Sequence, residues 1–212
     1  MYLPKHFEAP SVEAMHELIR AVPLATLVTL TESGIEANPI PLLLWSEPAP
    51  FGCLRGHVAR ANPLWHKVAP ETEVLAVFHG PDAYVSPGWY PSKREDGKAV
   101  PTWNYVAVHA YGRLRVIDDR DWLREQLAAL TTEHEAGMAN PWRLAEAPPD
   151  YIEKMLAAVV GIEIVVSRLE GKWKVSQNQP AANRAGVAAG LAASGHAGAV
   201  RMAELVAAGT AR

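Results

Sequence analysis

The 212-residue sequence is poor in cysteine, in long apolar runs and in excess charge of either sign. Its single cysteine, Cys53, excludes an intrachain disulfide, as is usual for proteins of reducing compartments. No apolar run reaches the length that crosses a bilayer. The first residues also lack the basic and apolar regions of a secretory signal. We therefore expect a cytoplasmic protein without membrane contact.

The net charge of −3 comes from acidic and basic residues that are interspersed along the chain. Binding to a phosphate backbone by charge needs clustered Lys and Arg, so the sequence gives no electrostatic sign of nucleic-acid binding. The sequence excludes a large basic surface but not a small basic patch. With 49% hydrophobic and 20% charged residues, the composition is that of an ordinary globular protein. The length suits one good core better than two large domains. We expect one domain over 1–178, with a helical tail over 179–212 packed on it.

Several catalytic motifs are absent. The chain has no Gly-x-Ser-x-Gly, no P-loop and no Gly-x-Gly-x-x-Gly. Its eight histidines form no His-x-His, no His-Glu-x-x-His and no pair with the cysteine. The sequence therefore assigns neither a catalytic residue nor a metal site.

The apolar pattern predicts short strands that follow one another, with helices towards both ends. Expected strands cover 25–31, 35–45, 51–56, 73–79, 105–117 and 161–169, and 173–175 pairs back across a turn at Glu170-Gly171. Expected helices cover 12–21, 63–68, 119–136, 149–158, 181–193 and 198–208. Ser11 is the expected N-cap of the first, and either Asp119 or Asp121 caps the third. Pro39 and Pro41 remove two ladder donors, which marks an edge strand or a bulge. This order favours a mainly β fold with peripheral helices, built on an antiparallel barrel.

Residues 84–105 combine five aromatic side chains with three prolines and a charged loop. Large rigid aromatics in a loop contact a ligand, a partner chain or the protein's own core. Ser86, Thr102 and Asn104 add hydrogen-bonding groups that suit a flat heteroaromatic ligand. Burial of the rings in their own chain stays open as the plainer alternative.

Two polar stretches are candidate binding sites. Arg55, His57 and Arg60 place three groups that can carry positive charge just before Asn62, which precedes Pro63 at a predicted helix start. Helix N-termini and arginines bind anions, so this turn fits a phosphate, although a solvated turn explains it about equally well. Gln177 and Asn178 present paired donors and acceptors to a ligand edge, or else they cap the turn before Pro180.

Taken together, these stretches resemble the PaiB-like FMN-binding negative transcriptional regulators, a branch of the flavin split-barrel superfamily that includes pyridoxamine 5′-phosphate oxidase. The segments that carry the resemblance are 1–7, 56–65, 78–90, 100–106 and 174–178. The resemblance implies a six-stranded antiparallel split barrel, dimeric, with FMN at the subunit interface.

The resemblance also implies which residues contact the flavin. The turn with Arg55, His57, Arg60 and Asn62 would hold the phosphate. The strand with Asn38, Pro39, Ile40 and Pro41 would run past the isoalloxazine ring. The second subunit would add contacts from Ser86, Trp89, Thr102, Trp103 and Asn104, and Gln177 remains a candidate ligand contact.

Three functions follow as expectations. The family name implies an FMN-binding homodimer in gene regulation, and DNA is a partner through that name alone. A flavin-dependent oxidoreductase, with a nicotinamide reductant or another small molecule as partner, is the enzymatic alternative, since hydride transfer by a flavin requires no titratable side chain. A barrel that has lost its flavin and serves as an interaction module is the third.

Overall fold

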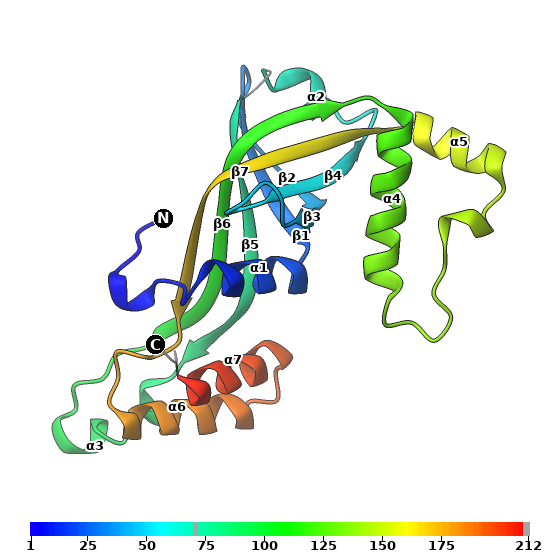
Figure 1. The fold of residues 1–212 in the computed structure, drawn as a ribbon. Coiled ribbons are helices and arrows are strands. Elements are labelled where there is room, and N and C mark those ends of the chain that lie inside the picture. The colour runs from blue at the N-terminus through cyan, green and yellow to red at the C-terminus, as the bar shows by residue number, and fades with distance from the viewer. Residues whose placement is uncertain (70–71, 210–212) are drawn as a thin grey trace. The chain divides into compact units, whose positions relative to one another are not determined.

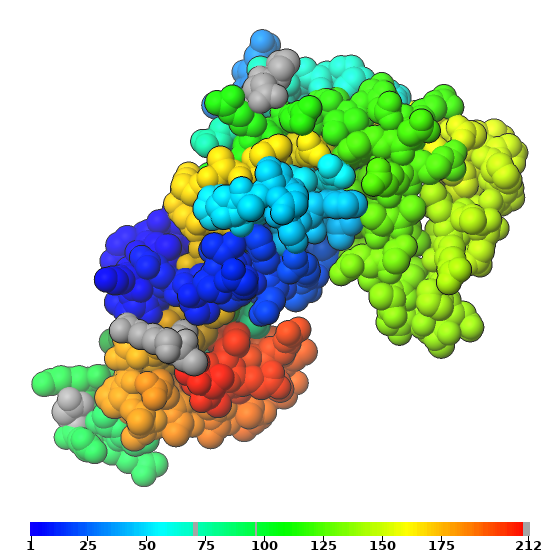
Figure 2. All heavy atoms as spheres, in the orientation of Figure 1, coloured from blue at the N-terminus to red at the C-terminus, as the bar shows by residue number. Residues whose placement is uncertain are grey.

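The structure is a computed structural model that describes residues 1–69 and 72–209. Of residue 96 it describes the backbone only. The chain divides into two compact units (Figures 1 and 2). Unit 1 comprises Met1–Val22, Phe78–His109 and Glu170–Arg212, of which 210–212 lie outside the described residues. Unit 2 comprises Pro23–Val77 and Ala110–Leu169. Three long strands contribute residues to both units.

The described residues form a seven-stranded sheet with the order β2-β1-β5-β6-β7-β4-β3. The strands are β1 Leu24–Thr31, β2 Gly34–Pro41, β3 Leu43–Trp45, β4 Cys53–Ala59, β5 Glu73–Val85, β6 Thr102–Ile117 and β7 Val159–Lys174. Pairing is antiparallel between β1 and β2, β1 and β5, β3 and β4, and β4 and β7. The predicted antiparallel β fold with peripheral helices is therefore confirmed. The resemblance implies six strands, whereas the described residues form seven. The segment 35–45 is broken at Leu42 into β2 and β3, and the expected strands 161–169 and 173–175 are one strand, β7.

The barrel character of unit 2 follows from that break. β2 and β3 lie at opposite ends of the strand order, yet Leu42 alone separates them. The sheet must therefore curl until its two edges approach each other. A Cβ at Gly56 on β4 would lie 2.7 Å from the carbonyl oxygen of Pro41 on β2, so only glycine permits this approach. Pro39 and Pro41 lie on an edge strand, as their missing N–H groups predict.

Alternation along the strands of unit 2 separates its core from its outer face. Leu27 on β1, Leu54 on β4, and Ile162 and Ile164 on β7 are fully buried. Apolar burial of this kind contributes about 1.5–3 kcal/mol for each large side chain. On β4 the intervening Arg55 and His57 are half-buried on the opposite face.

Two helices of unit 2, α4 Arg120–Glu135 and α5 Pro149–Ala157, form a second apolar cluster with the short 3₁₀ turn η3 Leu144–Glu146. The short helix α2 Leu64–Lys67 lies outside this cluster. α4 begins at Asp119, one of the two predicted caps, which accepts a hydrogen bond from Trp122 N at 2.8 Å. Leu123 of α4 packs with Ile152 and Leu156 of α5.

Unit 1 holds the N-terminal and C-terminal helices. These are η1 Lys5–Phe7, α1 Val12–Ala21, η2 Pro87–Trp89, α3 Lys93–Asp96, α6 Ala181–Ala193 and α7 Ala197–Ala208. Ser11 caps α1 as predicted, accepting from Ala14 N at 3.2 Å. α6 and α7 lie side by side (Figure 1) and form one continuous surface, orange and red in Figure 2. The large apolar side chains that these two helices bury are Val187, Leu191, Met202 and Val206.

Two strands of unit 1 are longer than the sequence predicts. β5 continues past residue 79 to Val85, and β7 runs through Glu170-Gly171, so the expected turn there is wrong. Gly80 and Gly171 instead allow α1 to approach the strands. A Cβ at Gly80 would lie 2.9 Å from Leu18, and one at Gly171 would lie 2.7 Å from Met15. Among the described residues no helix has the length and apolar character needed to traverse a lipid bilayer.

Candidate functional site

The residues predicted to contact a flavin fall into two groups. Unit 2 contains Asn38, Pro39, Ile40, Pro41, Arg55, His57, Arg60 and Asn62. Unit 1 contains Ser86, Trp89, Thr102, Trp103, Asn104 and Gln177.

In unit 2 the structure brings the predicted ring strand to the predicted phosphate turn. Asn62 Nδ2 donates to Asn38 Oδ1 at 3.4 Å, and Lys67 of α2 pairs with Glu36 of β2 at 2.8 Å. Asn62 also accepts a hydrogen bond from Leu64 N at 3.0 Å, so it caps the short helix α2. β2 and the turn at 59–63 therefore share one surface, as a site along both would require.

His57 is the residue in this group with an unsatisfied polar atom. Its Nδ1 is buried and has no hydrogen-bond partner among the described residues. Burial lowers the pKa of His57, because desolvation disfavours the imidazolium ion. Buried polar atoms nearly always have a hydrogen-bond partner, so the Nδ1 atom of His57 can form one more hydrogen bond.

Arg60 is held by protein groups. It forms a bidentate pair with Asp118, at 2.8 Å from Nη1 and 2.5 Å from Nη2. Its Nε donates to Ala157 O at 2.8 Å, and Nη2 also donates to Val159 O at 3.0 Å. The Asp118 carboxylate raises the pKa of Arg60, and Arg60 lowers the pKa of Asp118. Arg60 thus connects the turn after β4 to the turns before α4 and β7.

Arg55 is also engaged inside unit 2. Its Nε donates to Glu163 at 2.9 Å, and Arg115 pairs with the same carboxylate at 3.1 Å. The guanidinium carbon of Arg55 lies 4.6 Å from the ring centroid of Trp45 and 5.6 Å from that of Trp122. Both predicted arginines therefore already have a carboxylate partner.

The aromatic residues of unit 1 take two different roles. Trp89 packs on α6, where a Cβ at Gly190 would lie 2.4 Å from the indole ring and one at Gly186 would lie 2.1 Å from Trp89 O. Trp103 is 54% exposed and meets the edge of Tyr84, which is 47% exposed, at a centroid distance of 6.0 Å. Trp89 is half-buried and packs against its own chain, which is nearer to the plainer alternative, whereas Trp103 and Tyr84 remain available to a ligand or partner.

The polar residues predicted in unit 1 have local partners. Ser86 accepts from Gly88 N at 3.2 Å, and Gln177 accepts from Val175 N at 2.8 Å. Gln177 also donates to Trp173 O, so its amide is committed to its own turn. Asn104 is 1% exposed and donates to Ser176 Oγ at 2.9 Å. Thr102 accepts from Lys174 Nζ at 2.6 Å.

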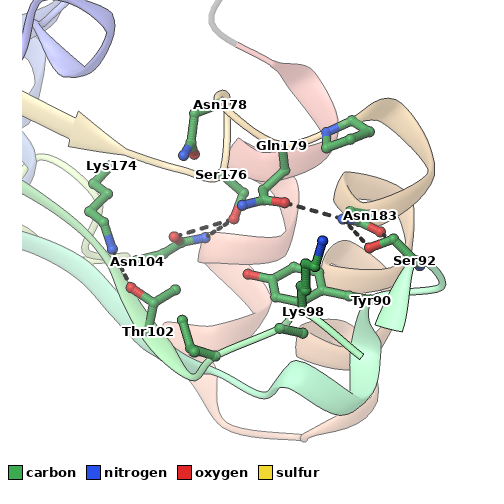
Figure 3. Close-up of a pocket in the computed structure, with 13 residues that line it drawn as sticks. Tyr90, Ser92, Lys98, Thr102, Asn104, Lys174, Ser176, Asn178, Gln179 and Asn183 are labelled. Carbon is green, nitrogen blue, oxygen red and sulfur yellow. Dashed lines mark hydrogen bonds between the residues drawn. The ribbon is translucent and has the colours of Figure 1, made fainter. Parts of the chain in front are cut away.

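Thr102 and Asn104 line a pocket of about 480 Å³ in unit 1 (Figure 3). The lining residues are Tyr90, Ser92, Lys98, Ala99, Val100, Thr102, Asn104, Lys174, Ser176, Asn178, Gln179, Pro180 and Asn183. Sequence reasoning did not assign Tyr90, Lys98 or Lys174 to a site. The polar run 174–179 is the part of the sequence that indicated this pocket. The remaining lining residues come from β6, from the segment 90–100 before it and from the start of α6.

A comparison of the sequence with protein-family models matches residues 1–168 to the family described as Putative FMN-binding domain. Among curated proteins, Protease synthase and sporulation protein PAI 2 of Bacillus subtilis is 32% identical over 206 residues. That alignment covers 97% of this chain and 96% of the relative.

Solved structures with the same fold include flavin proteins. The FAD and heme binding protein of Mycobacterium smegmatis superposes with a TM-score of 0.59 at 20% identity, covering 79% of this chain and 73% of that protein. A conserved hypothetical protein of Mycobacterium tuberculosis superposes with a TM-score of 0.60 at 11% identity, covering 85% and 94% respectively. These similarities establish a shared fold of the flavin split-barrel type.

Proposed function

Because the chain belongs to the family described as Putative FMN-binding domain, we propose that it binds FMN as a homodimer and takes part in gene regulation. The family match carries this proposal. It spans residues 1–168 and so includes both β2 and the turn that follows β4. The near full-length similarity to PAI 2, whose name refers to protease synthesis and sporulation, supports the regulatory part.

The residues of unit 2 fit a flavin in three respects. The exposed Pro39 and Pro41 leave the edge of β2 without donors at two positions, so a flat ring can lie there without breaking a ladder. The Asn38 and Asn62 amides lie together beside that edge. The buried His57 Nδ1 lacks a partner that a ligand group would provide.

The phosphate group calls for donors that are not already committed. His57 and the Asn62 amide are the donors that would hold it in unit 2. Arg60 would position the turn through Asp118, because its hydrogen bonds in the structure go to protein acceptors. Arg55 would act in the same indirect way through Glu163.

When bound, the flavin would supply one-electron or two-electron redox chemistry, and the residues of this chain would bind and orient it. The redox state of the flavin is then the quantity that a regulator of this kind senses, unless the cofactor is purely structural. His57, Asn62 and Asn38 are neutral donors or acceptors near neutral pH, which suits binding and orientation rather than proton transfer.

The dimer part of the proposal is supported by apolar side chains on the β1–β2 hairpin. Leu30 and Ile35 are direct cross-strand neighbours and are 64% and 77% exposed. Leu24 on the same strand is 64% exposed. Exposed apolar groups that adjoin one another are typical of protein interfaces.

The location of the flavin phosphate can be tested with Asn62→Asp. This variant keeps the oxygen that caps α2 but places a negative charge beside the phosphate. We expect FMN affinity to fall by about tenfold or more, while the affinity for riboflavin, which has no phosphate, stays the same. Asn140→Asp, an exposed position in the same unit, is the matched control. Equal losses for FMN and riboflavin would contradict this placement.

The regulatory role can be tested by DNA footprinting at low salt with the holoprotein. We expect protection of a discrete site upstream of a regulated gene. The absence of any protected site would count against direct repression. Rapid bleaching of the flavin by NADH or NADPH without oxygen would instead favour a flavin-dependent oxidoreductase.

A further inference from the structure

The pocket in unit 1 has the chemistry of an anion site. Its volume of about 480 Å³ lies in the range of small-molecule sites. Amide, hydroxyl and ammonium groups converge on it from β6, the end of β7 and the start of α6 (Figure 3). No Asp or Glu occurs among the described residues that line it.

Tyr90 provides a donor without a partner. The residue is 6% exposed, and Figure 3 shows its hydroxyl directed into the pocket. The described residues include no hydrogen-bond partner for that hydroxyl. Burial alone raises the pKa of Tyr90, so the group stays protonated and can donate. A buried tyrosine normally finds a partner for its O–H, and here only a ligand or solvent in the pocket can serve.

Lys174 provides a positive charge without a counter-ion. Its ammonium group donates to Thr102 Oγ1 at 2.6 Å and to Trp103 O, which are both neutral acceptors. None of the ion pairs among the described residues includes Lys174. Burial lowers the pKa of Lys174, and the charge of Lys172 adds to this effect. A half-buried ammonium ion with one N–H left over is stabilised by an anion.

Two further features increase the positive potential of the pocket. Pro180 and Asn183 at the start of the 13-residue helix α6 line it, and no side chain caps that helix end. The free N–H groups of a helix start favour negative charge. The chain of Lys98 also reaches into the pocket (Figure 3).

We propose that this pocket binds a small anionic metabolite through a carboxylate or phosphate group, held by the Tyr90 hydroxyl and by the ammonium group of Lys174. Ser176 and Asn183 shape the site. Ser176 is held at a φ of 62° and bonds to Asn104, and Asn183 donates to Ser92 Oγ at 3.0 Å and to Gln179 Oε1 at 3.2 Å. The pocket lies in unit 1, and several of its residues follow residue 168, where the family match ends.

Calorimetric titration of the full chain with inorganic phosphate and with malonate, at an ionic strength fixed by chloride, tests this site. We expect the wild type to bind at least one of the two anions. Tyr90→Phe keeps the ring and removes only the donor, so it should weaken binding about tenfold. Lys174→Gln should weaken it at least as much. Lys93→Gln removes the same charge from an exposed position outside the pocket and should bind within twofold of the wild type.

Competition with flavins identifies the source of the anionic group. Displacement of phosphate by FMN but not by riboflavin would show that the group is the flavin phosphate, which would then lie in this pocket and not beside Asn62 in unit 2. Phosphate binding that FMN leaves unchanged would show that it belongs to another metabolite, and both results support the site. Displacement by riboflavin as well would overturn the proposal, because the pocket would then hold the ring. So would a wild type that binds neither anion, or Tyr90→Phe and Lys174→Gln variants that bind as the wild type does.

Discussion

Arg60 is the residue where ligand binding and structural support compete most directly. The guanidinium group of an arginine has five N–H donors, and the four side-chain hydrogen bonds of Arg60 go to Asp118 and to two backbone carbonyls. One N–H of Nη1 is left over, so a phosphate could take only that single donor from Arg60 unless it replaced Asp118. We therefore treat Arg60 as a residue that positions the turn carrying Asn62.

Substitution at both ends of this pair distinguishes positioning from direct binding. If Arg60 positions the turn, Arg60→Ala and Asp118→Asn should both lower Tm and both weaken FMN binding, by about tenfold for Arg60→Ala. Arg120→Ala, which breaks an exposed pair with Glu153, is the control and should change neither. Thermal unfolding and FMN titration measure the two effects. An Asp118→Asn variant that binds FMN more tightly would show that Arg60 is a phosphate ligand.

His57 predicts how stability depends on pH. Because burial lowers the pKa of His57 in the folded protein, the unfolded chain binds this proton more readily. The stability that the neutral ring provides is complete above the ordinary histidine pKa of about 6.5 and is lost as the pH falls below it. Burial also lowers the pKa of His109, which contributes in the same direction.

Urea unfolding at about pH 7.5 and at about pH 5.5, roughly one unit either side of the ordinary histidine pKa, measures this effect. We expect the free energy of unfolding to be lower at the acidic pH in the wild type, and the difference to shrink in His57→Gln. His134→Gln, an exposed position on α4, should keep the wild-type difference. A His57→Gln variant with an unchanged pH dependence would refute the assignment.

At the scale of elements, the contact between η2 and α6 depends on two glycines. The indole of Trp89 occupies the space that a side chain at Gly190 would need. Gly190→Ala should therefore destabilise the protein by about 1–3 kcal/mol through overpacking, although alanine is the better helix former by about 1 kcal/mol. Urea unfolding measures the change.

A double-mutant cycle isolates this contact. In a Trp89→Ala background the obstacle is gone, so Gly190→Ala should stabilise the chain by about 1 kcal/mol relative to Trp89→Ala alone. Destabilisation of equal size in both backgrounds would show that Gly190 is required for another reason.

The sequence predicted the elements best where the signal is local. Ser11 and Asp119 start their helices as the capping rule predicts, and the proline pair places β2 at an edge. The turn predicted at Gly171 is wrong, because the sequence does not distinguish a glycine needed for a turn from one needed for close packing against a helix. The hydrogen bonds that hold Arg60 could not be predicted either, because the Asp118 carboxylate and the backbone carbonyls of Ala157 and Val159 come close to it only in the folded chain.

The candidate site was predictable only as separate segments. Resemblance to a family indicated β2 and the turn 55–62, and the Asn38–Asn62 contact brings those two together. The pocket with Tyr90, Lys98 and Lys174 was indicated only in part, by Thr102, Asn104 and the polar run 174–179, because its residues come from segments far apart in sequence. Trp89 illustrates the limit, since its position against α6 depends on glycines about a hundred residues further along the chain.

At the scale of the whole molecule, the exposed apolar side chains of the β1–β2 hairpin predict a homodimer. Ile35→Lys places a charge among the exposed apolar groups of β1 and β2, and should shift the protein from dimer to monomer in sedimentation velocity. Glu32→Lys adds a lysine to the turn of the same hairpin and should leave the dimer intact. A wild type that sediments as a monomer at micromolar concentration, or an Ile35→Lys variant that remains dimeric, would contradict the assignment of this surface.

The central claim is that this chain binds FMN, and an equilibrium titration of the purified protein with FMN tests it most directly. Quenching of flavin fluorescence and the visible absorbance of the bound flavin report the binding. The account predicts saturation at one FMN per chain, and weaker binding of riboflavin because it lacks the phosphate. A protein that is colourless as purified and takes up neither FMN, FAD nor riboflavin would contradict the account.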